Sequence, residues 1–248
     1  NVNILPVKVL GANGRGTVST VANGIYYAVN AGADVINLSL SAPEGSSSQI
    51  HIDFAVSEAS NQNISVVASS GNDYSDTAYY CPAHRSDVIV TAAIDMQHNN
   101  MHGFNVRGEE YGSNYGTSVD VTAPGVDVIS SVPYSINPMG YASYTGTSMA
   151  APHISAAVAM LKHLYPSAPA NQIQSILKSC ASDLGVSGYD ITYGEGLPIL
   201  SELITNLPFY DVQTSDWYYD VVLDVYTRGY MTGKGYDEYF GVMENIMR

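Results

Sequence analysis

The sequence has little positive charge, few cysteines and no long apolar run, and each shortage excludes a class of protein. Lys and Arg number 9 against 23 Asp and Glu, and so acidic a chain does not favour nucleic acid as a partner. No apolar stretch approaches the roughly 20 residues of a membrane-spanning helix. The 2 cysteines, Cys81 and Cys180, are too few for a disulfide framework and have no metal-site spacing between them. We expect two buried thiols, with a single bridge between them as the alternative.

What the chain does have is enough apolar sequence for a core. It holds 248 residues, 46% of them hydrophobic, which suits one large domain or one domain with a small appendage. Only 13% are charged, and 20 Tyr and 22 Gly are typical of an extracellular or surface protein. The sequence opens at Asn1 and passes directly into a strand-like run at 4–10. We therefore expect it to be part of a longer protein.

Strand and helix patterns alternate over the first hundred residues. Buried strands are predicted at 4–10, 34–40, 64–70 and 87–93, and helices at 17–31 and 49–61. Gly32 has the position of a helix C-cap. This alternation predicts parallel βαβ units with right-handed crossovers, hence an α/β fold. In such sheets functional residues gather at the carboxyl ends of the strands.

The stretch Gly146–His153 places one serine, Ser148, beside the start of an apolar helix predicted at 149–164. Pro152 is expected in the first turn, where its missing N–H has no partner to lose. The free N–H groups and partial positive charge of a helix N-terminus favour an anion beside Ser148. A serine placed there can attack a carbonyl group and have the oxyanion stabilised. The alternative is an apolar helix with a capping serine.

Gly146–His153 closely resembles the nucleophile motif of the subtilisin-like (S8) serine peptidases. Further segments resemble that family in its order along the chain: 37–41, 67–72, 80–83, 114–116, 119–125 and 193–198. The resemblance covers residues 1–206. It implies a three-layer α/β domain, with a mostly parallel twisted sheet flanked by helices, which is incomplete in this chain.

The resemblance also implies roles for individual residues. Ser148 is the nucleophile, and the Asn72 side chain with the Ser148 backbone N–H forms the oxyanion hole. The residues expected to bind substrate are Ser39, Leu40, Ser41, Ser69, Ser70 and Gly71. Ser41 stands where the family usually has Gly, and Ser69 and Ser70 replace Ala-Ala, so the depth and polarity of the pocket are left open. The alternative for Asn72 is a turn residue with positive φ.

A serine hydroxyl needs a base, and none is identified in this chain. The family takes its base from a His-Gly-x-His segment and its orienting carboxylate from Asp-Thr/Ser-Gly. None of the six histidines (His51, His84, His98, His102, His153 and His163) has that context, and Asp53, Asp73, Asp76 and Asp95 fail as well. Both segments precede this region in the family. The resemblance therefore implies N-terminal truncation, and we expect these residues alone to be inactive and to aggregate.

No metal or other cofactor is assigned. Some family members bind a weak cation near the equivalents of Ala83, Arg85, Val88 and Asp120. The resemblance thus allows a structural calcium ion, but the cation Arg85 stands at that place, so no calcium site is identified.

The character of the sequence changes at about residue 207. Residues 207–248 resemble part of an S-layer homology (SLH) module, with Phe209-Tyr210-Asp211-Val212 at the start and Trp217-Tyr218 shortly after. The resemblance implies a small, mainly helical appendage that attaches to bacterial cell-wall polymer. The alternative is a Tyr-rich helical tail that packs on the first domain.

Taken together, these patterns predict a fragment of a secreted or cell-wall-associated serine endopeptidase that cleaves extended polypeptides. The alternative, from the class of binding proteins, is a non-catalytic scaffold of the same fold with the tail as wall anchor. An esterase of the α/β-hydrolase type is disfavoured, since no Gly-x-Ser-x-Gly lies between a strand and a helix. An upstream reading frame with both missing motifs would favour the peptidase over the scaffold.

Overall fold

The computed structural model describes residues 2–43, 49–106 and 109–199. The predicted appendage at 207–248 lies outside the described residues, and so does the boundary at 206. Within the described part, the longest predicted elements are present. The helices are α1 (Val18–Asn30), α2 (Ile50–Asn61), α3 (Thr147–Leu164) and α4 (Ala170–Ser179). Thr17 caps the start of α1 by accepting a hydrogen bond from Thr20 N, and Gly32 follows its end with a φ of 75°.

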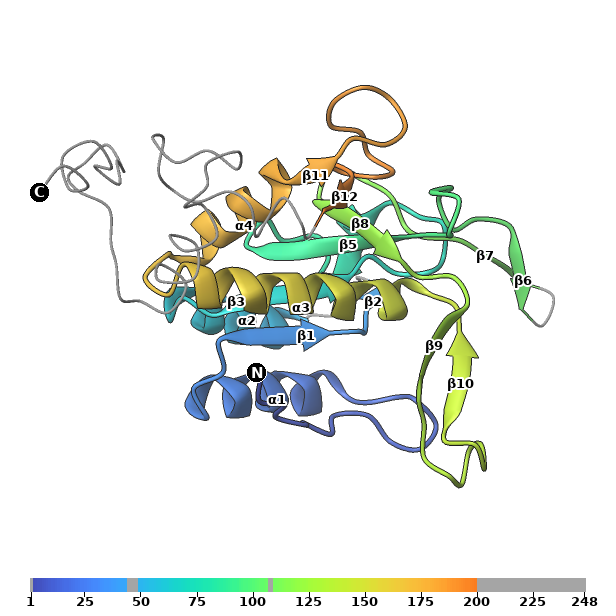
Figure 1. The fold of residues 1–248 in the computed structure, drawn as a ribbon. Coiled ribbons are helices and arrows are strands. Elements are labelled where there is room, and N and C mark those ends of the chain that lie inside the picture. The colour runs from blue at the N-terminus through green and yellow to red at the C-terminus, as the bar shows by residue number, and fades with distance from the viewer. Residues whose placement is uncertain (1, 44–48, 107–108, 200–248) are drawn as a thin grey trace, which may run out of the picture.

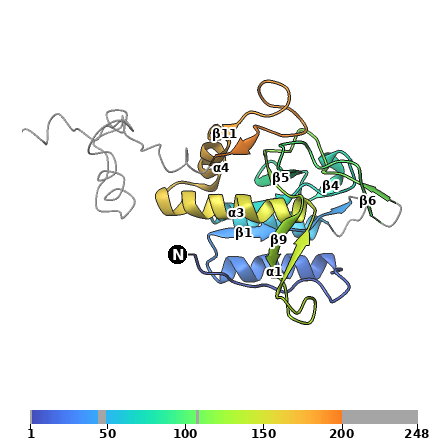
Figure 2. The ribbon, with the colours of Figure 1, turned by 45° about the vertical axis from the view of Figure 1, so that its right-hand side comes forward.

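The centre of the fold is a parallel sheet. Its strands are β1 (Val35–Leu38), β3 (Ser65–Ser69), β5 (Val88–Ile94) and β8 (Val121–Pro124), in the order β1-β3-β5-β8. Each neighbouring pair is parallel, which confirms the predicted βαβ units. Both views show α3 between α4 and β1, and α1 beyond β1 at the edge of the sheet (Figures 1 and 2).

The core consists of two apolar layers, one on each face of the sheet. Successive residues of β3 point to opposite faces, because side chains alternate along a strand. Val66 and Ala68 pack with α1 and α2, whereas Val67 packs with α3 and α4. β3 and β5 are buried along their whole length, as the unbroken apolar runs predict for strands covered on both faces. The expected three-layer α/β architecture is confirmed.

The predicted strand at 4–10 is wrong. Residues 2–9 have no regular secondary structure, and Val2, Ile4 and Leu5 are exposed. A strand needs a neighbour that supplies hydrogen bonds, and among the described residues β1 pairs with β3 alone. The apolar pattern instead packs the Val7 and Val9 side chains close to the α1 backbone at Gly24.

Short antiparallel pairs of strands lie outside the parallel sheet. They are β2 (Ala42–Pro43) with β4 (Tyr80–Cys81), β6 (Phe104–Val106) with β7 (Glu109–Tyr111), β9 (Val128–Ser131) with β10 (Tyr141–Tyr144), and β11 (Ala181–Ser182) with β12 (Leu197–Pro198). Cys81 and Cys180 are buried, belong to different layers of the core and form no disulfide, which matches the expectation of two thiols. Among the helices described, none is long and apolar enough to span a bilayer.

Candidate active site

Ser148 lies in the first turn of α3, at the carboxyl end of the parallel sheet. Figure 1 shows α3 beginning at the end of the sheet to which the arrowheads of β1 and β8 point. The helix starts at Thr147, after Gly146, so the Ser148 N–H is among the first four, which have no acceptor within the helix. The Ser148 side chain is half-buried. Its backbone N–H and hydroxyl are thus presented together at a helix N-terminus, as the sequence predicts.

Pro152 does not lie in the first turn, which corrects the sequence prediction. α3 begins two residues earlier than expected, so Pro152 is its sixth residue. A helical residue at this position would donate its N–H to the carbonyl of Ser148, four residues back, and proline cannot. Ser39 Oγ donates to that carbonyl instead, at 2.9 Å, and Ser148 Oγ donates to the Ser39 carbonyl at 3.2 Å. The missing helical bond is thereby replaced by a link to the end of β1.

Asn72 is bound to the residue before the candidate nucleophile. Its side-chain Oδ1 accepts hydrogen bonds from Thr147 N and Thr147 Oγ1, each at 2.9 Å. Because a backbone N–H can only donate, the atom that faces it must be the amide oxygen. The amide nitrogen, Nδ2, is therefore the end of the Asn72 side chain that can donate to a group beside Ser148.

The loop that carries Asn72 is fixed by a buried asparagine, Asn114, which is 0% exposed. Asn114 Nδ2 donates to Ser70 O at 3.0 Å, and Asn114 Oδ1 accepts from Asp73 N at 2.9 Å and Ser75 N at 3.0 Å. Gly71 has a φ of 108°, and a Cβ on it would overlap Asn114 Nδ2, so glycine is required there. Sequence reasoning quoted Thr147 and Asn114 within motifs but assigned neither a role in positioning Asn72.

The residues predicted to bind substrate fall into two groups. Ser39, Leu40 and Ser41 follow β1 and are half-buried, beside Ser148. Ser69 and Ser70 are 1% and 0% exposed, and Ser70 Oγ lies 3.3 Å from Ser113 Oγ. Their side chains therefore lie beneath the surface, so any part they have in shaping a pocket is indirect.

The Ser148 hydroxyl donates its hydrogen bond to the Ser39 carbonyl at 3.2 Å, and not to a histidine ring. His153 Nδ1 bonds to Met149 O at 2.9 Å on the same helix. His102 stacks edge-on against Tyr74, with ring centroids 3.9 Å apart.

The Asp120 carboxylate, which the family resemblance places near a weak cation site, already has protein partners. Its Oδ2 accepts from Val90 N at 2.8 Å, and its Oδ1 accepts from Lys178 Nζ at 2.9 Å and Gln174 Nε2 at 3.0 Å. A lysine ammonium group thus supplies positive charge to this carboxylate. The residues around Asp120 therefore give no support for calcium there.

Comparisons with known proteins agree with this fold. The family model of the subtilases matches residues 1–196. Subtilisin BL of Lederbergia lenta is 40% identical over 197 residues, which cover 79% of this chain and 66% of that protein. An alkaline protease of Alkalihalobacillus alcalophilus is 40% identical over the same length, covering 79% of this chain and 47% of that protein. The chain thus spans about half to two thirds of the length of these relatives.

Solved structures agree on the fold. A protease of Pseudoalteromonas arctica superimposes with a TM-score of 0.64 at 31% identity, covering 79% of this chain and 60% of that one. A lanthipeptide protease superimposes with a TM-score of 0.66 at 22% identity, covering 79% and 68% of the two chains; at that identity it supports the fold alone.

Proposed function

The chain belongs to the subtilase family, and from this membership we propose that it is the nucleophile-bearing part of a serine endopeptidase. Ser148 attacks the carbonyl carbon of the scissile peptide bond. The Asn72 side-chain N–H and the Ser148 backbone N–H donate hydrogen bonds to the oxyanion that forms. The observation that carries the proposal is the bond from Thr147 N to Asn72 Oδ1, 2.9 Å long, which ties the amide to the residue before Ser148.

The proton of Ser148 must be removed for this attack, and we propose that the base comes from sequence outside these 248 residues. A histidine and its orienting aspartate, in the family's motifs, would complete the site. Two observations support this. β1 has an edge that no described strand pairs with, and the chain spans only 66% and 47% of two relatives. A strand added beside β1 would approach Ser39 and Ser148 from that open side.

The substrates we propose are extended polypeptides. The segment Ser39–Ser41 continues β1 beyond the sheet, half-buried and adjacent to Ser148. An extended peptide that adds to such a segment is held by main-chain hydrogen bonds whatever its sequence. This favours broad specificity, with Ser41 altering the side-chain pocket.

The location we propose is outside the cell. The relatives include subtilisins and alkaline proteases by name, and residues 207–248 carry the SLH-like pattern that favours attachment to cell-wall polymer. The competing proposal is a scaffold without catalysis, and the lack of a base among the described residues is the observation that favours it.

Labelling with a fluorophosphonate probe separates the two proposals. The probe would be applied to the product of the longest reading frame that contains these residues, and to its Ser148→Ala and Ser175→Ala variants. Ser175 is an exposed serine on α4 and serves as the matched control. We expect labelling of the parent and of Ser175→Ala only. Labelling that persists in Ser148→Ala would show that another residue is the nucleophile, and no labelling of the parent would favour the scaffold.

A further inference from the structure

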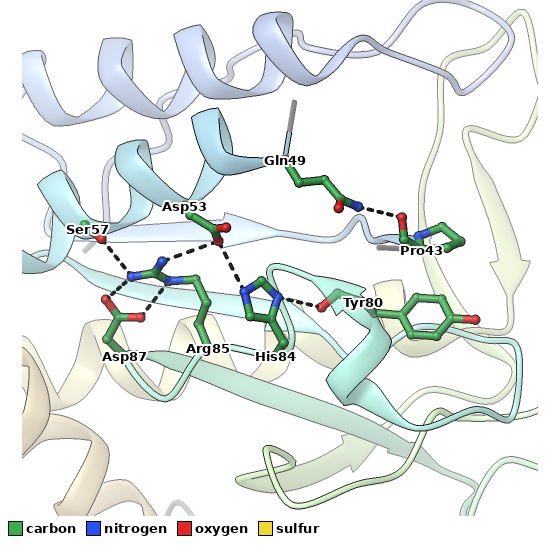
Figure 3. A network of polar contacts seen from close by, with 8 residues as sticks. All are labelled: Pro43, Gln49, Asp53, Ser57, Tyr80, His84, Arg85 and Asp87. Carbon is green, nitrogen blue, oxygen red and sulfur yellow. Dashed lines mark hydrogen bonds and ion pairs between the residues drawn. The ribbon is translucent and has the colours of Figure 1, made fainter. Parts of the chain in front are cut away.

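Three side chains with metal-binding atoms converge on the side of the sheet away from α3. They are Asp53 on α2, Cys81 in β4 and His84 in the turn that follows, and their ligand atoms all lie within 4.8 Å of one another. Figure 3 shows Asp53 and His84 from this group with the polar residues around them. The Cys81 side chain is 1% exposed, whereas those of His84 and Asp53 are 24% and 26% exposed. The cluster thus has a buried sulfur and a route to solvent.

The orientation of His84 points to a cation. His84 Nδ1 lies 3.2 Å from the Tyr80 carbonyl oxygen, which can only accept, so Nδ1 carries the proton. His84 Nε2 then faces Asp53 Oδ1 at 3.4 Å, and in the neutral ring Nε2 is a lone pair directed at a carboxylate. Asp53 Oδ1 is buried and accepts no hydrogen bond within the part of the chain that is described. A metal ion placed between these two atoms would bind both of them.

We propose that Asp53, Cys81 and His84 bind a zinc-like divalent cation. Zinc takes thiolate, imidazole and carboxylate ligands in a tetrahedron, with bonds of about 2.0–2.3 Å, whose edges are about 3.3–3.8 Å long. The 3.4 Å separation of His84 Nε2 and Asp53 Oδ1 is already such an edge. The Nδ1–H to carbonyl bond is the contact by which metal-binding histidines are oriented. Water completes the fourth position, and the Cys81 thiol proton is released to solvent on binding.

Arg85 is the feature that opposes a cation here. Its Nη1 lies 3.3 Å from Asp53 Oδ1. However, Arg85 Nε and Nη2 also form a two-pronged pair with Asp87, at 2.8 Å and 2.7 Å. Burial alone would lower the pKa of Arg85, but the Asp87 and Asp53 carboxylates outweigh it and raise the pKa, so the side chain stays charged. With the metal bound, the Cys81 thiolate, Asp53 and Asp87 balance the dication and Arg85.

The ion would join α2 to β4, the strand that pairs with β2 beside the proposed substrate segment. β4 pairs with β2, with Cys81 opposite Ala42, and Ala42 directly follows the segment Ser39–Ser41. A metal ion at this place would stabilise the fold and would take no part in the chemistry at Ser148. The inference is therefore independent of the proposed peptidase function.

Cobalt(II) tests the site, because it replaces zinc and gives a visible and near-ultraviolet spectrum that reports thiolate and tetrahedral ligation. Co²⁺ would be titrated into the metal-free product of the longest reading frame that contains these residues, followed by Zn²⁺. We expect one equivalent of Co²⁺ to bind with a thiolate charge-transfer band, and Zn²⁺ to remove the band. Cys180→Ser, which changes the other buried cysteine, should leave the band unchanged.

The ligand variants should behave differently from that control. Cys81→Ser and His84→Gln should lower the affinity for Co²⁺ by more than about 100-fold and abolish the rise in melting temperature that Zn²⁺ gives the parent. A parent chain without the thiolate band would overturn the proposal. A band that persists in Cys81→Ser, with native far-ultraviolet circular dichroism, would overturn it as well.

Discussion

The two ends of the Asn72 amide have different tasks. The oxygen accepts from Thr147 N and Thr147 Oγ1 at 2.9 Å each, which fixes the side chain. The nitrogen is left to donate to the oxyanion of the proposed reaction. Removal of one such donor typically costs about 3–4 kcal/mol of transition-state stabilisation. A substitution that keeps the oxygen and removes the nitrogen therefore isolates the second task.

Asn72→Asp is that substitution. In the complete enzyme, its carboxylate still accepts from Thr147 but places negative charge beside the oxyanion. We expect kcat to fall by at least about 10²–10³-fold with KM little changed, measured on a chromogenic peptide. Asn72→Ala loses both tasks and is the companion variant. If Asn72→Asp keeps the parent kcat while Asn72→Ala loses it, Asn72 has only a positioning role.

At this scale the sequence singles out the proposed reacting residues but not the residues that support them. Ser148 and Asn72 stand in short contiguous motifs, so local pattern is enough to find them. Asn114 bonds to Asp73 and Ser75, 41 and 39 positions away. The Ser39–Ser148 pair joins residues 109 positions apart. Such contacts follow from the packed sheet, and no periodicity in the sequence encodes them.

The first turns of α3 illustrate how one element compensates for its own proline. Pro152 cannot donate to the Ser148 carbonyl, and Ser39 Oγ donates to it instead. A half-buried carbonyl without a partner is costly, whereas the hydrogen bond contributes about 1 kcal/mol. Ser39 is therefore as much a part of the helix start as of the proposed substrate segment.

A double-mutant cycle between Ser39 and Pro152 measures this compensation. Ser39→Ala should destabilise the parent by about 1 kcal/mol, because the Ser148 carbonyl loses its donor. In the Pro152→Ala background the restored N–H supplies a donor, and the loss should shrink by about 0.5–1 kcal/mol. Urea unfolding of the parent and the three variants, each made as the product of the longest reading frame that contains these residues, provides the numbers. Ser39→Ala also removes the hydrogen bond from Asn37 Nδ2 to Ser39 Oγ. That bond is lost in both backgrounds, so the cycle cancels its contribution. Additive effects would contradict the compensation.

The helices α1, α2 and α3 and the strands β1, β3 and β5 were predicted from sequence to within a few residues, whereas the run at 4–10 was predicted as a strand and is not one. These strands and helices have regularly spaced apolar residues, and that spacing can be seen in a short window of sequence. Residues 4–10 have the composition of a strand, but a strand also requires a partner, and sequence composition carries no information on whether one is present. The start of α3 was predicted two residues late. The helix begins at Thr147, directly after Gly146, and the Thr147 N–H is bound by the distant residue Asn72. The apolar pattern of the helix carries no information on that contact.

For the molecule as a whole, the proposed additional segment would account for both the open edge of β1 and the source of the base for Ser148. Parallel sheets are normally covered on both faces and continued or protected at their edges. Among the residues that the structure describes, β1 pairs with β3 alone, and the apolar side chains Val2, Ile4 and Leu5 are exposed in the segment before α1. A strand beside β1 would cover that edge and lie next to Ser148. In the proposed function, the fold and the catalytic site thus depend on the same additional segment.

The 248-residue chain alone should consequently associate and should not hydrolyse peptides. Unpaired N–H and C=O groups on β1 offer a template for a second chain, and Ser148 without a base is a poor nucleophile. Size-exclusion chromatography with light scattering should show species larger than the monomer that grow with protein concentration. A fluorogenic polypeptide should be cleaved no faster by this chain than by its Ser148→Ala variant, which controls for contaminating proteases. A monodisperse monomer with a cooperative melt would refute the first expectation, and cleavage that is lost in Ser148→Ala would refute the second. The two outcomes are independent, because a covered edge requires only a strand, whereas cleavage requires that the strand bring a histidine and an aspartate to Ser148.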